Sequence, residues 1–441
     1  MKKTLIALLL IISLTLSLAG CSAAPVKVET PEGHSGDNTV IETPNGQNKP
    51  DEPDQPIIPV IPEDTVVSVI ACGDNIIHGP INTHGEKYGY ASIYEKIAPL
   101  VAEKDISYIN VETLIGGDEY GFSGYPNFNS TSKVGENLVD MGFDVMNLAH
   151  NHMLDAPGRD KALYLRNCAK FFEERNCTPI GYYSSEADTE NIRITEVKGI
   201  KIAWLAYTYD DNQAYDFAAS ENNSYNDCSV NGHKPNTSTD VYIPYLKKAL
   251  IEKQVAIAKQ KADVVIVSAH WGIEDSYSAP NTVFPTHKMQ DAYGQVFADC
   301  GVDVVIGMHP HVIQKTEWIE GKSGNKTLCA YSLGNLLSRM LWGRNMIGAM
   351  MEFDIVKDGA TGEIRIENAY MVPTICQYNR SSADFKIIPF SEYTEELAAA
   401  HGCHQNDATD RKRGKVFSYE AIKEKIDKTY DPQFLKEGYV A

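Results

Sequence analysis

The sequence has no pair of cysteines at C-x-x-C spacing, and its only basic cluster is Arg411 to Arg413. The missing C-x-x-C pairs exclude a zinc ribbon and a thioredoxin-type redox site. Lys and Arg number 40 against 59 Asp and Glu, so the formal charge is −19. Because binding to nucleic-acid phosphates needs clustered basic side chains, we expect no nucleic-acid partner. A bound cation would be one way to attract an anionic polymer to such a chain.

Long hydrophobic runs are also scarce, and the longest, Leu5 to Leu18, lies near the N-terminus after Lys2 and Lys3. It is shorter than the ~20 residues that a membrane span needs. The run ends in Leu-Ala-Gly-Cys21, which resembles a bacterial lipoprotein signal, residues 1–20, with cleavage before Cys21 and lipid attachment to it. An ordinary signal peptide or a short membrane helix is the alternative. We therefore predict an extracytoplasmic protein that a lipid on Cys21 anchors to the bacterial cell membrane.

The remaining chain divides by composition. Residues 21–64 are rich in Pro, Asp, Glu and Asn and poor in apolar residues, which predicts a flexible tether. Residues 65–390 carry the strand and helix patterns of a domain, and residues 391–441 are a C-terminal extension with one helical stretch, 418–429. The polar stretch 213–239 predicts a long surface loop. Cys72 and Cys329 lie in apolar runs, where buried free thiols are expected; the pairing of the other cysteines stays open.

Strands alternate with helical stretches from Thr65 onward, which predicts a layered α/β fold. Helical spacing of apolar residues is found in three stretches: Tyr90 to Glu103, Lys161 to Glu174 and Val241 to Lys261. After Ile306 the predicted strands follow one another directly: Lys326 to Ser332, Met346 to Val356 and Glu363 to Val372. This second part is expected to be the more antiparallel part of a mixed sheet.

Five apolar runs end in Asp, Glu, Asn or His: Val66 to Asp74, Ile106 to Glu112, Val145 to Asp155, Val264 to Glu274 and Val302 to His311. Open α/β sheets bind ligands outside the carboxyl ends of their strands. In extended backbone, His309 and His311 would project to the same side. Mixed imidazole, carboxylate and amide ligands suit Mn, Fe or Zn better than Ca or Mg. The sequence therefore predicts a site for one or two divalent transition metal ions.

Six motifs, taken in order, resemble the CapA/PgsA family of bacterial capsule and poly-γ-glutamate synthesis proteins. They are G-D at Gly73, N-V-E at Asn110, N-H-x-x-D at Asn151, H-W-G-x-E at His270, G-x-H-P-H at Gly307 and S-L-G-N at Ser332. That family is similar in fold to calcineurin-like metallophosphoesterases. The resemblance implies a four-layer α/β/β/α sandwich with mixed sheets, in which metal ions lie at strand ends.

The resemblance also implies roles for single residues. Asp74 and His311 would bind one metal, and Glu112 would take the bridging position. The second metal would be held by Asn151, His270 and His309, and His152 would be the general acid for the leaving group. Six further residues would support these ligands or contact the substrate: Asn110, His78, Asp155, Thr208, Glu274 and Asn335.

Two departures from the metallophosphoesterase pattern concern the first metal. The usual D-x-H is Asp74-Asn-Ile76 here, so that metal lacks its histidine, and the bridging aspartate is replaced by the longer Glu112. His78, four residues after Asp74, is a candidate substitute ligand or substrate contact.

Three functions follow as hypotheses. The first is a metal-dependent hydrolase or transferase that acts on a cell-envelope polymer, or on its phosphorylated or amide-linked precursor, beside membrane-bound polymer synthase subunits. The second is a non-catalytic component of a polymer synthesis complex that binds an anionic chain. The third is a solute-binding lipoprotein, which would need two lobes and a hinge.

Overall fold

The computed structural model describes residues 62–210, 212, 241–274, 285–340, 342–405 and 417–439. The predicted signal segment, Cys21 and the predicted loop 213–239 lie outside the described residues, as does the predicted tether except for residues 62–64. The described elements belong to one compact unit, Val60–Ala441. None of the helices in the described ranges has the length and apolar character that crossing a bilayer requires.

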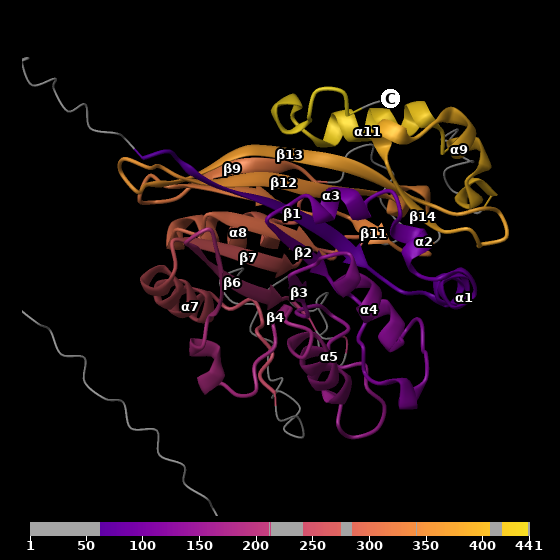
Figure 1. Ribbon diagram of the computed structural model, residues 1–441, viewed down its shortest axis with the longest axis horizontal. Helices are drawn as coiled ribbons and strands as arrows, with labels where there is room; N and C mark the ends of the chain where they lie inside the picture. Colours follow the sequence, from indigo (N-terminus) through magenta and orange to yellow (C-terminus); the bar gives the residue numbers. More distant parts are fainter. Residues whose placement is uncertain are drawn as a thin grey trace, which may run out of the picture. The chain divides into compact units, whose positions relative to one another are not determined.

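The strands form two mixed sheets (Figure 1). The first has the order β14-β13-β12-β1-β2-β3-β4, with β11 also paired to β1, and the second has the order β5-β6-β7-β8-β10-β9. The strands of the first sheet are β1 Thr65–Asn75, β2 Ile106–Asn110, β3 Val145–Asn147, β4 Thr178–Ile180, β11 Asn335–Leu337, β12 Ile347–Lys357, β13 Ile364–Gln377 and β14 Lys386–Pro389. Those of the second are β5 Arg193–Val197, β6 Ile200–Thr208, β7 Val264–His270, β8 Val304–Met308, β9 Thr316–Glu320 and β10 Lys326–Ala330.

Helices cover the outer face of each sheet. On the first sheet they are α1 Gly79–Tyr88, α2 Ala91–Tyr94, α3 Ala98–Ala102, α4 Ser132–Asp140 and α5 Leu163–Glu173, and on the second α7 Lys248–Lys261 and α8 Lys288–Cys300. The C-terminal helices are α9 Glu395–Ala400 and α11 Tyr419–Thr429. Short 3₁₀ turns lie at Asp118–Tyr120, Ala187–Glu190, Gly343–Met346, Phe390–Glu392, Gly402–Gln405 and Pro432–Phe434.

Alternation along the strands builds three cores. On β1, Val67, Val69 and Ala71 face the second sheet, whereas Ile70 and Cys72 face the helices of the first. On β6, Ile202 and Trp204 join the core between the sheets, and Ala203 and Leu205 pack with α7 and α8. These three cores separate four layers, so the predicted α/β/β/α sandwich with mixed sheets is confirmed. Cys72 and Cys329 are buried and free, as expected.

Four aspartates make the same pair of hydrogen bonds at the amino ends of the parallel strands. Asp303, just before β8, accepts the Val265 N–H of β7 at 2.8 Å, while its own N–H donates to the Val265 carbonyl at 3.0 Å. The same two-way bracket joins Asp105 to Ser68, Asp144 to Ser107 and Asp263 to Lys201. Each bracket fixes the register of two neighbouring parallel strands, because it pairs one residue of each at the point where the ladder begins.

Three expectations about elements need correction. The helix predicted over residues 241–261 begins only at Lys248, because Pro244 disfavours helix before it and residues 242 and 245 instead form β-bridges. The helix predicted over residues 90–103 is divided into α2 and α3, with Pro99 in the first turn of the second piece. Lys326 to Ala330 is in the second sheet with β8 and β9, apart from β12 and β13.

The C-terminal segment extends the inner core. The predicted helix 418–429 is confirmed as α11, whose N-cap Ser418 accepts the Ala421 N–H. Ile422 and Ile426 of α11 pack in the same core as Ile375 and Ile388 of β13 and β14. Figure 1 shows α11 and α9, in yellow, lying along the orange strands β13 and β14.

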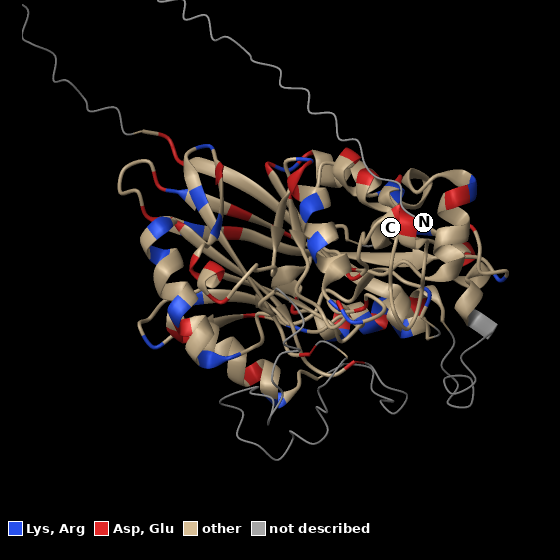
Figure 2. Cartoon of the chain, turned by 90° about the horizontal axis from the view of Figure 1, so that it is seen from below, with Lys and Arg blue, Asp and Glu red and all other residues tan. Residues whose placement is uncertain are grey.

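Charges of both signs are interspersed over the described ribbon (Figure 2). Several helices pair them at i and i+4, as Lys248 does with Glu252 and Lys423 with Asp427. In such pairs the positive charge of the lysine is balanced by a neighbouring carboxylate on the same helix.

Candidate metal centre

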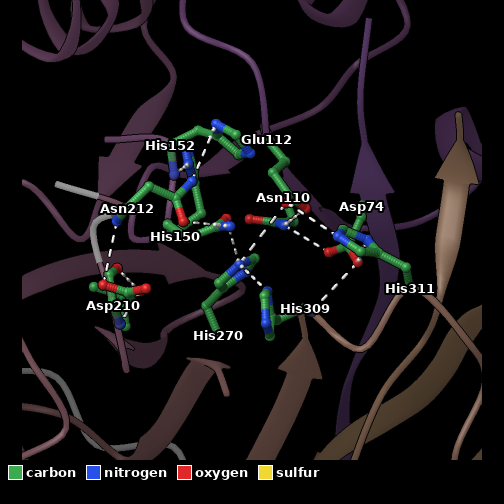
Figure 3. A network of polar contacts seen from close by, with 12 residues as sticks. Asp74, Asn110, Glu112, His150, His152, Asp210, Asn212, His270, His309 and His311 are labelled. Carbon is green, nitrogen blue, oxygen red and sulfur yellow. Dashed lines mark hydrogen bonds and ion pairs between the residues drawn. The ribbon is translucent and has the colours of Figure 1, made fainter. Parts of the chain in front are cut away.

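The six predicted metal ligands lie together at the carboxyl ends of the strands. Figure 3 labels five of them, and Asn151 contacts the labelled His270. Asp74 is the penultimate residue of β1, and His270 is the last residue of β7. Glu112 follows β2, and Asn151 follows β3. His309 and His311 follow β8. Each of the six is at most 4% exposed, so this is a buried polar cluster rather than a surface patch.

Two glycines let the strands that carry these residues approach each other. A Cβ on Gly73 would lie 2.1 Å from the Gly334 carbonyl oxygen, and one on Gly307 would lie 2.1 Å from that of Tyr331. Asp74 N–H donates to the Gly334 carbonyl at 3.0 Å across the first of these contacts. The glycines of the G-D and G-x-H-P-H motifs are therefore needed for close packing of backbone.

The backbone at the two histidines differs from the expectation. His309 has φ 97° and His311 has φ 56°, so the segment is a left-handed turn and the prediction of extended backbone is wrong. The chain has to turn sharply here because Ile313 pairs with Leu333 directly afterwards. Such conformations cost roughly 1–3 kcal/mol each and concentrate at functional sites.

Asp74, Glu112 and His311 form one part of the cluster. His311 Nδ1 lies 3.2 Å from Asp74 Oδ2, and its Nε2 lies 3.7 Å from Glu112 Oε1. His309 N–H points to Asp74 Oδ2 at 3.3 Å. The imidazole of His311 therefore stands between the two carboxylates.

Asn151, His270 and His309 form the other part. His270 Nε2 lies 3.1 Å from Asn151 Oδ1 and 3.1 Å from His309 Nδ1. The same nitrogen lies 3.9 Å from Glu112 Oε1. A proton on His270 Nε2 can be donated to only one of these three atoms. The other two then direct lone pairs towards His270 without receiving a hydrogen bond from it.

Burial dominates the electrostatics of these groups. It raises the pKa of Glu112 well above its usual value, and the neighbouring Asp74 raises it further. Burial lowers the pKa values of His270 and His309 well below normal, and neighbouring histidines add to this. At His311 burial also lowers the pKa, but Glu112 and Asp74 outweigh it and raise it to about 10. A bound cation would take the place of the protons that now lie between these carboxylates and imidazoles.

The donor set fits a divalent transition metal. The described part of the chain contains two groups whose potential ligand atoms lie within 4.8 Å of one another, Glu112 with His309 and His311, and Glu112 with Asp74 and His270. Glu112 belongs to both, and its buried Oε1 has no hydrogen-bond partner. A buried carboxylate oxygen without a donor, surrounded by imidazole nitrogens, is what a metal of the Mn, Fe or Zn kind would satisfy.

His152 lies beside this cluster and is oriented from its other side. Its Nδ1 is 2.8 Å from Asp155 Oδ2, which also accepts the Phe128 N–H at 2.7 Å. The Phe128 and His152 rings meet edge to face at 4.7 Å. Asp155 and Phe128 thus fix the imidazole plane and leave Nε2 as the nitrogen available for proton transfer.

Two asparagines support the ligands from behind. Asn110 Nδ2 donates to Asp74 Oδ1 at 2.7 Å, and Asn110 Oδ1 accepts from Asn147 at 2.7 Å. Asn335 Oδ1 lies 3.0 Å from His311 Nδ1, while its Nδ2 donates to the Asn345 carbonyl at 3.0 Å. Both asparagines are fully buried and hold Asp74 and His311, respectively, in position.

The other three predicted residues lie outside the ligand groups. His78 is half-buried, and its Nδ1 accepts the Arg339 N–H at 3.2 Å. Thr208 is fully buried, and its hydroxyl donates to the Asp210 carbonyl at 2.7 Å. Glu274 is exposed on the loop after β7.

The sequence analysis missed several neighbours of the cluster. Tyr209 packs on His309 with ring centroids 4.5 Å apart, and Asn212 lies 3.3 Å from Asn151 and 3.4 Å from His152. His150 accepts the His152 N–H at 3.1 Å. The run Thr208 to Asn212, which begins with the last residue of β6, resembles the other strand ends and was the available signal for Asn212.

Solved structures overlap the chain only partially. A phosphatase from Mycoplasma pneumoniae covers 70% of this chain and 94% of its own at 12% identity, with a TM-score of 0.40. A hypothetical protein from Thermus thermophilus covers 69% and 99% at 14% identity, with a TM-score of 0.38. At these scores the overlaps support no inference about chemistry.

Sequence relatives are more informative. The PGA biosynthesis protein CapA of Bacillus subtilis (strain 168) is 28% identical over 305 residues, which are 69% of this chain and 71% of that protein. The capsule biosynthesis protein CapA of Bacillus anthracis is 26% identical over 302 residues, 67% of this chain and 66% of that one. Residues 68–340, which include every motif described above, match the model of the family named bacterial capsule synthesis protein PGA_cap. The chain therefore belongs to the PGA_cap family of bacterial capsule synthesis proteins.

Proposed function

We propose that the protein is a membrane-anchored, extracytoplasmic, metal-dependent hydrolase or transferase that acts in the synthesis, export or anchoring of capsule or poly-γ-glutamate. Family membership supports the pathway. The observation that carries the metal dependence is the buried Oε1 of Glu112, which has no hydrogen-bond partner and lies among His270, His309 and His311.

The metal ligands would be Asp74, Glu112, Asn151, His270, His309 and His311, with Glu112 able to serve two ions. Once bound, divalent ions would acidify a water or other nucleophile and hold an anionic substrate. The buried ligands hold this position with little freedom, since Asn110 and Asn335 fix Asp74 and His311 from behind.

Proton transfer to the leaving group would fall to His152. Its Nδ1 faces the Asp155 carboxylate, so Nε2 would carry the proton that the leaving oxygen or nitrogen takes up. Asp155 stabilises the protonated imidazole through the 2.8 Å contact and keeps the ring from rotating, as does the edge contact with Phe128. The His78 ring also packs on Phe128, with ring centroids 5.4 Å apart, and His78 would contact the substrate.

The substrate would be an anionic cell-envelope polymer, or its phosphorylated or amide-linked precursor. With a chain charge of −19, the bound ions would supply the positive field that such a substrate needs. Membrane-bound polymer synthase subunits are the expected neighbours, because a lipid on Cys21 would keep the protein at the membrane. Cys21→Ser should release the chain from the membrane fraction; retention of the variant there would contradict lipid anchoring.

A second candidate is a non-catalytic component that holds an anionic polymer through a bound cation. It is favoured by one observation: a buried isoleucine, Ile76, occupies the position of the histidine in D-x-H. A solute-binding lipoprotein is disfavoured, since the two sheets share one core and do not form two lobes.

Turnover separates the first two candidates. The full chain, purified in detergent and supplied with Mn, Zn or Fe, would be assayed on phosphodiester, phosphomonoester and poly-γ-glutamate substrates. His152→Ala should lower turnover by about 100-fold or more while leaving the bound metal in place, because general acid catalysis contributes roughly 10²–10⁴-fold.

The matched control is His84→Asn, which changes a histidine of α1 that contacts Ser92. It should leave turnover unchanged. Metal-dependent binding of poly-γ-glutamate without turnover, equal in the wild type and in His152→Ala, would overturn the catalytic proposal in favour of the binding component.

A further inference from the structure

The side-chain amide of Asn151 has to present one particular atom to the metal centre. An amide coordinates a cation through its oxygen, because its nitrogen carries two N–H donors and no available lone pair. Asn151 Oδ1 lies 3.1 Å from His270 Nε2, and Asn151 Nδ2 donates to Asn212 Oδ1 at 3.3 Å. Asn212 is thus the acceptor for the end of the amide that faces away from the centre.

The flipped amide would disable two ligands at once. With Nδ2 towards His270, an N–H of Asn151 would donate to the lone pair of His270 Nε2. Neither Asn151 nor His270 would then offer a free lone pair to a cation. Asn151 is 4% exposed and His270 is fully buried, so the flipped amide would have little solvent with which to replace its lost contacts.

The turn after β6 holds Asn212 in place for this contact. Asp210 Oδ1 accepts the Asn212 N–H at 3.2 Å, and the Thr208 hydroxyl donates to the Asp210 carbonyl at 2.7 Å. Asn212 has φ 58°, a left-handed conformation that asparagine tolerates better than most residues. Figure 3 shows Asn212 beside Asp210 and facing His152.

We propose that Asn212 is a positioning residue of the metal centre, whose side-chain oxygen selects the orientation of Asn151 in which Oδ1 faces the metal. The inference rests on the proposed metal binding and adds a residue from a strand end to which no ligand had been assigned. The second contact of Asn212, from Nδ2 to His152 Nδ1 at 3.4 Å, is the weaker one, because Asp155 already lies 2.8 Å from that nitrogen.

Two substitutions distinguish the effect of the Asn212 side-chain oxygen from the effect of its backbone conformation. Asn212→Gly removes the side chain and tolerates the positive φ. Asn212→Asp keeps an oxygen acceptor for Asn151 Nδ2 and loses the donor towards His152. Asn176→Gly is the matched control, because Asn176 is also exposed, has φ 61° and follows α5.

The measurement is the dissociation constant for Mn²⁺, by titration calorimetry of the full chain in detergent, together with the melting temperature in chelator. Asn212→Gly should weaken binding about 10–100-fold, as loss of an outer partner of a metal ligand does. Asn212→Asp should bind as tightly as the wild type or tighter, and Asn176→Gly should match the wild type. Melting temperatures in chelator should agree among all four proteins.

The inference is overturned if Asn212→Gly binds Mn²⁺ like the wild type, or if Asn212→Asp is as weak as Asn212→Gly. A wild-type chain that binds no Mn²⁺, Zn²⁺ or Fe²⁺ would overturn the proposed function, and this inference with it.

Discussion

The two ends of the parallel strands carry similar acidic side chains, but only the carboxyl ends hold buried carboxylate oxygens that lack a hydrogen-bond donor among the described residues. At the amino ends, each of four aspartates accepts a backbone N–H of the neighbouring strand: Asp105, Asp144, Asp263 and Asp303. At the carboxyl ends, Glu112 Oε1 and Asp155 Oδ1 are buried with no hydrogen-bond partner among the described residues. At the amino edge, the carboxylates are hydrogen-bonded to backbone and fix the strand register. At the carboxyl edge, these two carboxylate oxygens keep lone pairs that could bind a cation.

This contrast predicts opposite consequences for substitutions at the two edges. A change at the carboxyl edge should alter metal binding and leave the stability of the metal-free chain nearly intact. A change at the amino edge should alter stability and leave metal binding intact. Any residue that affects both, or neither, would break the comparison.

The largest effect is expected for His270→Leu at the carboxyl edge. Loss of a ligand should weaken Mn²⁺ binding by more than the ~100-fold that loss of an outer partner can cost. In chelator, the free energy of unfolding should fall by less than about 1.5 kcal/mol. Leucine has a similar volume, and the loss of the Nε2 contacts with Asn151 and His309 is partly offset because a buried imidazole whose Nδ1 has no hydrogen-bond partner is removed. Calorimetric titration and urea unfolding provide the two readouts.

A pH-dependent effect is expected at Asp303 on the amino edge. Burial raises the pKa of Asp303 to about 6, against 3.8 for the exposed side chain. The folded chain therefore binds this proton more tightly than the unfolded chain, so the contribution of Asp303 to stability falls as the pH rises from about 4 to about 6. The loss should be up to about 3 kcal/mol, at about 1.4 kcal/mol per pH unit.

Asp303→Asn is the variant that isolates this contribution, since its side-chain oxygen still accepts the Val265 N–H. The free energy of unfolding of both proteins would be measured at pH 4, 5, 6 and 7. As the pH rises, the variant should become more stable relative to the wild type. A difference that stays constant over this range would contradict the assignment of a partly buried Asp303 that binds a proton more tightly in the folded chain.

The smallest effect is expected for Asp105→Ala. The Ser68 N–H and hydroxyl lose their acceptor, and Lys198 loses its partner at 2.8 Å. An unpaired backbone group costs about 1–3 kcal/mol, and this site lies at the lower end because it is only partly buried. Binding of Mn²⁺ should be unchanged, and a weaker Mn²⁺ affinity in this variant would show that the two edges are coupled.

The sequence predicted a layered α/β fold and the cluster of polar side chains at its strand ends because both depend on local patterns. Alternating or continuous apolar residues mark strands, and the carboxyl ends of parallel strands meet at one edge, so Asp74, Glu112, His270 and His309 had to lie close together. Their roles on individual metals came from the family resemblance and stay predictions.

What the sequence did not predict depends on contacts between distant segments. The left-handed turn at His309 and His311 follows from the pairing of Ile313 with Leu333. Asn212 reaches Asn151 across 61 residues of sequence, and no local pattern announces that contact. The aspartate brackets had a recurring signal, an Asp directly before Ile106, Val145, Val264 and Val304, with a partner on another strand.

The most direct test of this account is the metal content of the full chain, measured by elemental mass spectrometry after purification without added metal. His309→Ala and His311→Ala would be measured alongside it, with circular dichroism as the check on folding. The account predicts one or two equivalents of Mn, Fe or Zn in the wild type and loss of metal in both variants. Absence of metal in the wild type even after incubation with all three ions, or equal content in folded variants, would contradict the assignment of the carboxyl edge as a metal centre.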